Sequence, residues 1–251
     1  MDEQQFLLSE KYSGKETPEY RADLERLKKG EPLAYIIGWI PFLGCRIFLD
    51  SRPLIPRTET EYWVEKTLQE FPAEKNLKML DLFAGSGAVG IAVLKNLPNT
   101  RVDFGELHAA HFSTIEKNLK ENGIKRSQAS FYETDVWSKI SGRYDVIFAN
   151  PPYLSKTRTS RIEKSVLLHE PHLALFVENN GMSLIEKTIL GLPNHLDAGG
   201  RCYIEHEPEQ TKPIALLAAS IGFFCKTYCD QYQTPRFTKI SRSLKSSHLA
   251  I

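Results

Sequence analysis

The feature that most constrains the fold is an alternation of apolar runs and helical patterns that begins near residue 77 and continues to the end of the chain. Strands are expected at residues 77–83, 100–106, 128–135, 144–150 and 199–207, with helical segments between them. The last two segments, FFCKTYCD and PRFTKIS, predict an antiparallel pair. Strands that alternate with helices predict an α/β fold, in which a parallel sheet is covered on both faces.

The residues before this alternation predict helices. Thr17-Pro18 has the pattern of a helix start and Gly30 that of a helix stop. Residues 1–16 have room for one more short helix.

The next segment, residues 34–49, is rich in β-forming residues, glycine and proline, which predicts a β-hairpin with its turn near Pro41 to Gly44. Thr58-Glu59-Thr60-Glu61 has the pattern of a capping box, and YWVEKTLQEF continues that helix. We therefore expect a short helical N-terminal segment at 1–32, a β-hairpin linker at 33–56 and the α/β domain at 57–251.

The composition argues against several classes of protein. A net charge of +1 gives no case for a broad nucleic-acid-binding face. No apolar run approaches the roughly 20 residues that cross a bilayer, and the N-terminus has neither the basic region nor the apolar core of a signal peptide. The scattered cysteines lack paired CxxC spacing, which favours free thiols over a metal site. We expect a cytoplasmic protein without a bound metal.

A glycine-rich turn predicts a cofactor site. The segment from Asp81 to Gly90, DLFAGSGAVG, lies between a predicted strand and a predicted helix and contains G-x-G-x-x-G. Glycines at such a turn let a ligand press against the backbone at a helix N-terminus. Glu106 ends the next strand, where a carboxylate can accept hydrogen bonds from both hydroxyls of a ribose. Together these features favour an adenosine-containing cofactor over a purely structural turn.

The acidic residues help to distinguish between two candidate cofactors. A dinucleotide would fit the glycines. However, Asp81 precedes the glycine loop, where it could hold the ammonium of an amino acid, and Asp135 ends the third strand, beside the expected adenine. Each aspartate alone could equally cap a loop. Acidic groups along successive strand ends suit a cation better than a pyrophosphate, which favours S-adenosylmethionine, with its ammonium, sulfonium and ribose diol.

The segment FANPPY, Phe148 to Tyr153, ends the fourth strand at the same predicted edge. Proline cannot donate to a sheet ladder, and Pro151 keeps Asn150 out of the helical region, so the strand stops in a stiff turn. The side-chain carbonyl of Asn150 and the carbonyl of Pro151 offer two acceptors, which match the two donors of one NH₂ group. Fixed acceptors can stabilise the positive charge that develops on such a nitrogen during methylation. A proline-stopped loop without chemistry is the alternative.

Asn150-Pro151-Pro152-Tyr153 resembles the NPPY signature of amino methyltransferases, whose fold is a seven-stranded Rossmann-like sheet with a reversed last hairpin. DNA adenine, RNA amino and protein glutamine methyltransferases share this signature, so it implies the reaction type and leaves the substrate open. Longer segments are similar to the release-factor glutamine methyltransferase family: EPLAYIIG (31–38), LIPRTETE (54–61), EPHLAL (170–175), IEHEPEQ (204–210) and DQYQTPR (230–236). The resemblance runs from about Glu31 to the end of the chain.

The resemblance implies a substrate and a set of site residues. The substrate would be the glutamine in the GGQ loop of a peptide chain release factor. The catalytic turn would be Asn150, Pro151, Pro152 and Tyr153, with Asn150 and the Pro151 carbonyl holding the glutamine amide. The cofactor-binding residues would be Asp81, Phe83, Gly85, Gly87, Glu106, Leu107, Asp135, Val136 and Asn150. The substrate-binding residues would be Arg57, Glu61, Asn150, Pro151 and Tyr153.

Three features depart from the family pattern. About 30 residues precede EPLAYIIG, where the family usually has a substantial helical domain that grips the release factor. The glycine loop reads DLFAGSG where the family more often has DLGTGSG, and Phe83-Ala84 resembles some RNA guanine methyltransferases. His206 follows Ile204-Glu205 where the family has a glycine, and we expect it to be a strand-end residue.

Three other functions compete with this interpretation. The first is a methyltransferase acting on an exocyclic amino group of RNA or DNA, against which stand the near-neutral charge and the EPLAYIIG and PRTETE segments. The second is a binding module that has lost activity, against which stand Asp81, Glu106 and Asn150. The third is an NAD-dependent oxidoreductase, which the glycines alone would suggest. We expect a monomer that methylates a release factor and does not bind nucleic acid stably. The basic residues Lys156, Arg158 and Arg161 are expected to keep the next loop solvated.

Overall fold

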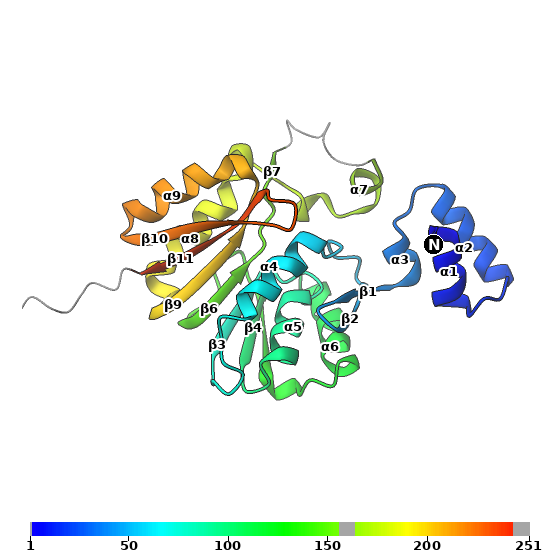
Figure 1. The fold of residues 1–251 in the computed structure, drawn as a ribbon, viewed down its shortest axis with the longest axis horizontal. Coiled ribbons are helices and arrows are strands. Elements are labelled where there is room, and N and C mark those ends of the chain that lie inside the picture. The colour runs from blue at the N-terminus through cyan, green and yellow to red at the C-terminus, as the bar shows by residue number, and fades with distance from the viewer. Residues whose placement is uncertain (1, 156–163, 243–251) are drawn as a thin grey trace, which may run out of the picture.

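The structure, a computed structural model, describes residues 2–155 and 164–242. Within these residues seven strands form one sheet in the order β10-β11-β9-β6-β3-β4-β5 (Figure 1). The strands β9, β6, β3, β4 and β5 are parallel, whereas β11 is antiparallel to β9 and β10 is antiparallel to β11. The α/β prediction, with its reversed last hairpin, is confirmed. The strands are β3 (Lys78–Leu82), β4 (Arg101–Glu106), β5 (Ala129–Glu133), β6 (Tyr144–Ala149), β9 (Leu196–Glu205), β10 (Phe223–Cys229) and β11 (Pro235–Arg242).

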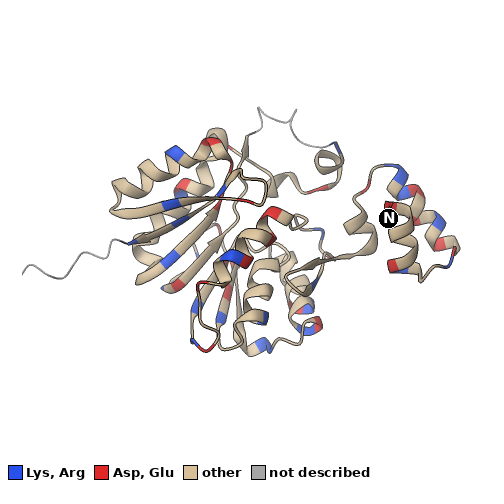
Figure 2. Ribbon diagram, viewed as in Figure 1, with Lys and Arg blue, Asp and Glu red and all other residues tan. Residues whose placement is uncertain are grey.

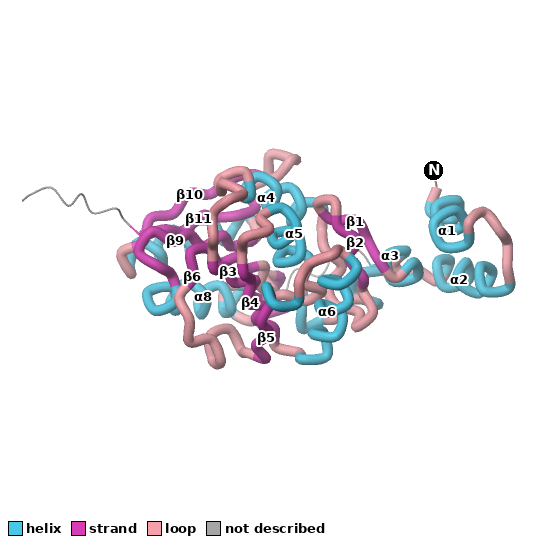
Figure 3. The backbone as a smooth tube through the Cα atoms, turned by 90° about the horizontal axis from the view of Figure 1, so that it is seen from below, coloured by secondary structure: helices cyan, strands magenta, loops and turns pink. Residues whose placement is uncertain are grey.

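Helices pack on both faces of this sheet (Figure 3). One face carries α4 (Thr58–Leu68), α5 (Ala88–Asn96) and α6 (Phe112–Glu121), and the other carries α8 (Ser183–His195) and α9 (Thr211–Ser220). Strand β6 shows that both faces of the sheet are buried under helices. Its Val146 and Phe148 belong to the first core, and Ile147 and Ala149 belong to the second, because side chains alternate along a strand.

The N-terminal helices form a small unit at one end of the molecule (Figures 1 and 3). They are α1 (Glu3–Tyr12), α2 (Pro18–Lys28) and α3 (Leu33–Ile37), and Leu7, Tyr20 and Ile36 form a cluster between them. As expected, Thr17 begins α2, and its hydroxyl accepts a hydrogen bond from the amide of Tyr20 at 3.2 Å. Residues 1–16 contain the expected short helix.

The predicted hairpin is shorter than expected. Its strands are β1 (Trp39–Phe42) and β2 (Cys45–Phe48), joined at Leu43-Gly44, so the turn was placed correctly. The start at residue 34 was wrong, because residues 33–37 form α3. Gly38, with φ of 93°, ends that helix and releases the chain into β1.

The predicted capping box at the start of α4 was also wrong, although the helix itself is present. The Thr58 hydroxyl donates to the Glu59 carboxylate instead of capping the helix. The Glu61 carboxylate accepts a hydrogen bond from the amide of Leu43 at 2.7 Å. Glu61 therefore stabilises the hairpin turn, which takes it away from the helix end that it was expected to close.

The segment between β6 and α8 follows the carboxyl end of β6, and its residues 150–155 and 164–182 are described. It contains β7 (Leu154–Ser155) paired in parallel with β8 (Phe176–Val177), the helix α7 (Lys164–His169) and the short 3-10 helices His172–Ala174 and Asn179–Gly181. Further 3-10 helices among the described residues are Ala109–His111, Arg126–Gln128 and Pro208–Gln210. Lys156, Arg158 and Arg161 lie outside the described residues.

Charged residues of both signs are interspersed over the helices and strands (Figure 2), as the net charge of +1 would suggest. Of the helices in the described part of the chain, none combines the length and the apolar character needed to cross a membrane.

Candidate active site

The sheet register brings the predicted site residues to one edge. Leu82 of β3 is paired with Gly105 of β4 and with Ala149 of β6, and Ala149 is paired with Ile204 of β9. The residues that follow on these four strands are Phe83, Glu106, Asn150 and Glu205. They therefore lie side by side at the carboxyl edge, where open α/β sheets bind their ligands.

Two pockets meet at this edge, and Asn150 lines both. The first, here called the glycine-loop pocket, is lined by Phe83, Gly85, Glu106, Leu107, Asp135, Val136, Pro152 and other residues. The second, here called the Tyr153 pocket, is lined by Arg57, Glu59, Pro151, Tyr153, Glu205, Glu207, Arg236 and other residues. Leu54 and Ala174 also line both pockets. The structure thus places the Asn-Pro-Pro turn between two adjoining binding spaces.

The glycine-loop pocket has the chemistry of a site for a cationic group with hydroxyls. Glu106 accepts hydrogen bonds from the amides of Gly85 at 2.9 Å and His108 at 3.0 Å, one on each carboxylate oxygen. Each oxygen keeps a further lone pair for a ligand hydroxyl. Asp135 is exposed beside it. Among the described residues that line this pocket, none is Lys or Arg. Lys187, which pairs with Asp135 at 3.4 Å, is not part of the lining, so a pyrophosphate would face the Glu106 carboxylate without a cation in the pocket wall. These residues fit S-adenosylmethionine better than a dinucleotide.

The backbone of this pocket is unusual. Phe83 and Val136 have φ of 67° and 54°, a conformation that side-chain-bearing residues rarely adopt. Local interactions hold both: the amide of Phe83 donates to Gly105 O at 2.9 Å, and the Thr134 hydroxyl donates to Val136 O at 3.1 Å. Backbone strain of about 1–3 kcal/mol per residue is typical of ligand-binding sites. Both residues line the pocket where the cofactor was predicted.

Two predicted cofactor residues lie beneath the glycine loop rather than in the pocket lining. Asp81 is buried, and its carboxylate accepts a hydrogen bond from the amide of Gly90 at 2.8 Å. Burial raises the pKa of Asp81 to about 8, and the charge of Glu106 adds to the effect. Gly87, with φ of 77°, is the first residue before α5 and packs against Ile115 and Phe104. Both support the loop, and direct contact with the cofactor stays a prediction.

The Asn-Pro-Pro-Tyr turn is fixed by hydrogen bonds at several points. The Asn150 side chain donates from Nδ2 to the Thr60 hydroxyl at 3.3 Å. The Tyr153 hydroxyl donates to the Glu205 carboxylate at 2.8 Å, and burial followed by the charge of Glu205 raises the pKa of Tyr153 well above its usual value. The Tyr153 carbonyl accepts from Gln210 Nε2 at 2.9 Å.

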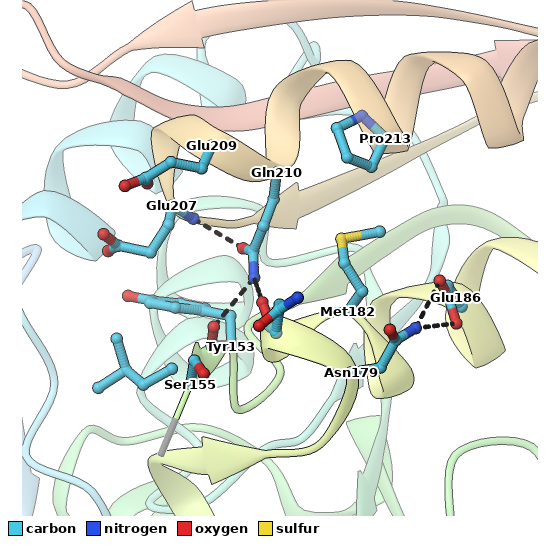
Figure 4. A pocket seen from close by; sticks show the side chains of 11 residues that line it. Tyr153, Ser155, Asn179, Met182, Glu186, Glu207, Glu209, Gln210 and Pro213 are labelled. Atoms are coloured by element: carbon cyan, nitrogen blue, oxygen red, sulfur yellow. Dashed lines mark hydrogen bonds between the residues drawn. The ribbon is translucent and has the colours of Figure 1, made fainter. Parts of the chain in front are cut away.

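A third pocket adjoins the Tyr153 pocket and shares Tyr153, Leu154 and Glu207 with it. Figure 4 shows Gln210 reaching across this space toward the Tyr153 backbone, while its Oε1 accepts from the amide of Glu207 at 2.9 Å. Gly181 leaves room for this contact, because a Cβ there would lie 1.9 Å from the Tyr153 carbonyl oxygen. The end of the turn therefore has little freedom to move.

Of the two predicted substrate-binding residues Arg57 and Glu61, only Arg57 lines the Tyr153 pocket. Arg57 lines the Tyr153 pocket and forms an ion pair with buried Glu170 at 2.7 Å. The second Glu170 oxygen accepts from the amide of Ile55 at 3.1 Å. This bond ties the segment before α4 to the segment after α7, and Leu54 and Ala174, on these two segments, line both pockets. Glu61 is directed to the hairpin, whereas its neighbour Glu59 lines the Tyr153 pocket.

Glu205, Glu207 and Arg236 were not predicted as site residues, although they lie in the segments IEHEPEQ and DQYQTPR that resemble the family. Arg236 forms ion pairs with Glu207 at 2.9 Å and Asp230 at 3.2 Å, which brings these two segments together beside the Tyr153 pocket. The resemblance was the signal that could have pointed to them.

His206 lies just beyond β9 and is buried. Its Nδ1 donates to the carbonyl of Glu207, and its Nε2 accepts from the Thr238 hydroxyl, both at 2.8 Å. Burial lowers the pKa of His206 to about 4, so the ring is neutral near pH 7.

Comparison with known proteins agrees with this geometry. Residues 65–198 match the family model of the methyltransferase small domain. The release factor glutamine methyltransferase of Lactococcus lactis subsp. lactis (strain IL1403) is 35% identical over 211 residues, which cover 84% of this chain and 77% of the relative. The enzyme of the same name from Flavobacterium psychrophilum is 36% identical over 225 residues, covering 87% and 78%.

Solved structures confirm the fold. A methyltransferase from Pyrococcus furiosus superposes with a TM-score of 0.59 at 17% identity and covers 88% of this chain and 95% of its own. The ribosomal protein L11 methylase of Lactobacillus delbrueckii subsp. bulgaricus gives 0.57 at 18% identity, covering 76% and 81%. The sheet is thus that of the S-adenosylmethionine-dependent (class I) methyltransferases, and S-adenosylmethionine is the methyl donor. On the strength of the matched family model and of relatives covered over most of their length, this chain belongs to the release factor glutamine methyltransferase family.

Proposed function

We propose that this protein methylates the side-chain amide nitrogen of a glutamine in a peptide chain release factor, the glutamine of its GGQ loop. The observation that carries the proposal is the position of Asn150, which lines both the glycine-loop pocket and the Tyr153 pocket. A methyl donor in the first pocket and an amide in the second would meet at this residue. Family membership supports a release factor as the source of the amide.

The residues around the turn would act by positioning. Asn150 Oδ1 and the Pro151 carbonyl would accept the two amide protons of the glutamine, which places its nitrogen toward the methyl donor. S-adenosylmethionine supplies a methyl group activated by the adjacent sulfonium. The acceptors would stabilise the positive charge that builds up on the nitrogen as its bond to the methyl carbon forms. The alkylated nitrogen is acidic and loses its proton to water, so no strong base is required.

We propose the following roles in cofactor binding. Glu106 holds the ribose hydroxyls, and Asp135 lies beside the adenine. Phe83, Leu107 and Val136 form the walls, and the glycine loop brings the backbone close to the ligand. The support for these roles is that all of these residues line the glycine-loop pocket. We also propose that the protein acts as a monomer in the cytoplasm, where release factors work.

The test uses tritiated S-adenosylmethionine with the host's release factors and, separately, with total RNA. We expect label on a release factor at the GGQ glutamine. Asn150→Ala should lower the rate by about 10²–10³-fold, the usual cost of removing one fixed polar contact to the reacting group. A release factor with the glutamine replaced by asparagine is the matched substrate control and should stay unlabelled. Label on RNA, or none on any release factor, would contradict the proposal.

A further inference from the structure

Glu205 is a buried carboxylate between the catalytic turn and helix α4, with 1% of its surface exposed. Its Oε2 accepts hydrogen bonds from the Thr60 hydroxyl and from Trp63 Nε1, both at 2.6 Å. Its Oε1 accepts from the Tyr153 hydroxyl at 2.8 Å. Three donors converge on one group, and an ionised carboxylate, which only accepts, satisfies all of them. Burial raises the pKa of Glu205, and these donors together with the charge of Arg236 oppose that rise.

The hydrogen bond from Thr60 to Glu205 determines the orientation of the Asn150 side-chain amide. The Thr60 hydroxyl has one hydrogen, and it points to Glu205. Only a lone pair of the Thr60 oxygen is left to face Asn150, so Asn150 must present its NH₂ group there. Its Oδ1 is consequently on the side away from Thr60. If Thr60 were not committed to Glu205, its hydroxyl could donate to Oδ1 and the amide could turn over.

Orientation matters because a glutamine amide nitrogen carries only donors. An Asn150 amide with Oδ1 toward the substrate accepts one of its protons, whereas the reversed amide would place two NH₂ groups face to face. Burying a charge is costly, but without the carboxylate the donors of Thr60, Trp63 and Tyr153 would lack an acceptor. A positioning role is therefore distinguished from a structural role by its effect on kcat at a nearly unchanged KM.

We propose that Glu205 is a positioning residue for the methyl transfer. Through Thr60 it sets the orientation of the Asn150 amide, and through the Tyr153 hydroxyl it fixes the ring that lines the substrate space. The inference rests on the proposed function, because it concerns how that site holds an amide. Glu205 follows Ile204, which is paired with Ala149 next to Asn150, so the sheet register delivers the carboxylate to the turn.

The first test removes the Thr60 hydroxyl that connects Glu205 to Asn150, and then restores it. Thr60→Val keeps the size of the side chain but offers Asn150 no acceptor, and Thr60→Ser keeps the hydroxyl. For Thr60→Val we expect kcat to fall about 10- to 100-fold, less than for Asn150→Ala, because the Asn150 acceptor is misoriented part of the time and not removed. KM for the release factor and the affinity for S-adenosylmethionine should change by less than about threefold. The melting temperature should fall by a few degrees, at about 2–4 °C per kcal/mol, because buried Glu205 loses one of its donors. Thr60→Ser should recover most of kcat.

The second variant, Glu205→Gln, tests the link to Tyr153. A glutamine has one oxygen for the donors Thr60, Trp63 and Tyr153, and the indole N–H cannot accept a bond from an NH₂ group. The glutamine NH₂ should therefore face Tyr153 and break its present bond. We expect kcat to fall at least about fivefold with KM little changed. Wild-type kcat in both Thr60→Val and Glu205→Gln would overturn the proposal, as would equal losses in Thr60→Val and Thr60→Ser.

A measurement without substrate separates this inference from the proposed function. The ¹H–¹⁵N side-chain amide signals of Asn150 can be assigned by their loss in Asn150→Asp. They should shift and exchange faster with water in Thr60→Val but stay near their wild-type positions in Thr60→Ser. Unchanged signals in Thr60→Val would refute the orientation by Thr60, even if a release factor is methylated. If no release factor is methylated but the signals shift as expected, the orientation holds and only the substrate was wrong.

Discussion

Among single residues, Asp81 is expected to make the free energy of unfolding depend on pH. Its pKa is raised to about 8 in the folded protein, chiefly by burial, and is about 3.9 in an unfolded chain. Between these values the folded state binds more protons than the unfolded state, so stability falls as pH rises. We expect the free energy of unfolding to drop more steeply from pH 7 to pH 8 in the wild type than in Asp81→Asn, by up to about 1.4 kcal/mol per pH unit. Urea unfolding of both proteins without cofactor measures this.

Between pH 7 and pH 8 His206, whose pKa is lowered to about 4 in the folded protein, is neutral in that state and mostly neutral in the unfolded chain. Its small contribution to the slope is the same in the wild type and in Asp81→Asn. Parallel slopes for the wild type and Asp81→Asn would show that Asp81 is ionised in the folded protein.

The sequence indicated some site residues and not others for a physical reason. Glu106 and Asn150 could be predicted because Glu106 is the last residue of an apolar strand and Asn150 directly follows one, and the carboxyl ends of parallel strands share an edge. The role of Glu205 could not, because its partners Thr60 and Trp63 are 145 and 142 residues away along the chain. The same holds for Glu170, whose partners lie more than 110 residues earlier. Local patterns contain no information about such contacts.

Among the elements, helix α5 and strand β4 are in unusually close contact. A Cβ at Gly90 in α5 would lie 2.3 Å from Cε1 of Phe104, a ring in the middle of the core. Alanine favours a helix over glycine by about 1 kcal/mol, but overpacking a core typically costs about 1–3 kcal/mol. Because a buried ring cannot move aside easily, we expect Gly90→Ala to destabilise the protein by about 1–2 kcal/mol, measured by urea unfolding.

The matched control is Gly199→Ala, since a Cβ at Gly199 has no atom within 4 Å. It should change stability by less than about 0.5 kcal/mol. A Gly90→Ala protein as stable as the wild type would mean that α5 can move away from β4. In that case the third glycine of the motif would not be required by packing.

Elements were predicted best where their own residues determine them. The run of apolar residues in β6 reflects two buried faces, and it identified the strand. The prediction of a capping box failed because the Glu61 carboxylate accepts a hydrogen bond from the Leu43 amide instead. No local sequence pattern reveals that contact. The hairpin start failed because LAYII was assigned by its β-forming residues, although Ile36 packs against α1 and α2 as part of a helix.

In the whole molecule, the N-terminal helices have a core of their own. Leu7, Tyr20 and Ile36 form a cluster separate from the two cores of the sheet. Asp23 holds α1 to α2: it accepts hydrogen bonds from Lys11 at 2.6 Å, Tyr12 at 2.7 Å and Arg26 at 2.6 Å. A unit with a separate core can open locally while the rest stays folded.

Asp23→Asn should test this independence. The asparagine loses the charge and presents an NH₂ group to these donors, which costs about 1–3 kcal/mol for a buried acceptor. We expect faster hydrogen exchange in residues 3–28 and unchanged exchange in the strands β3 and β4. Asp50→Asn, which removes a partly exposed ion pair with Lys117, is the matched control and should change neither region. If the helices also grip the release factor, KM for it should rise in Asp23→Asn while kcat stays constant. Faster exchange that spreads into β3 and β4 would show instead that the helices and the sheet unfold together, and the N-terminal unit could then not be altered without the catalytic site.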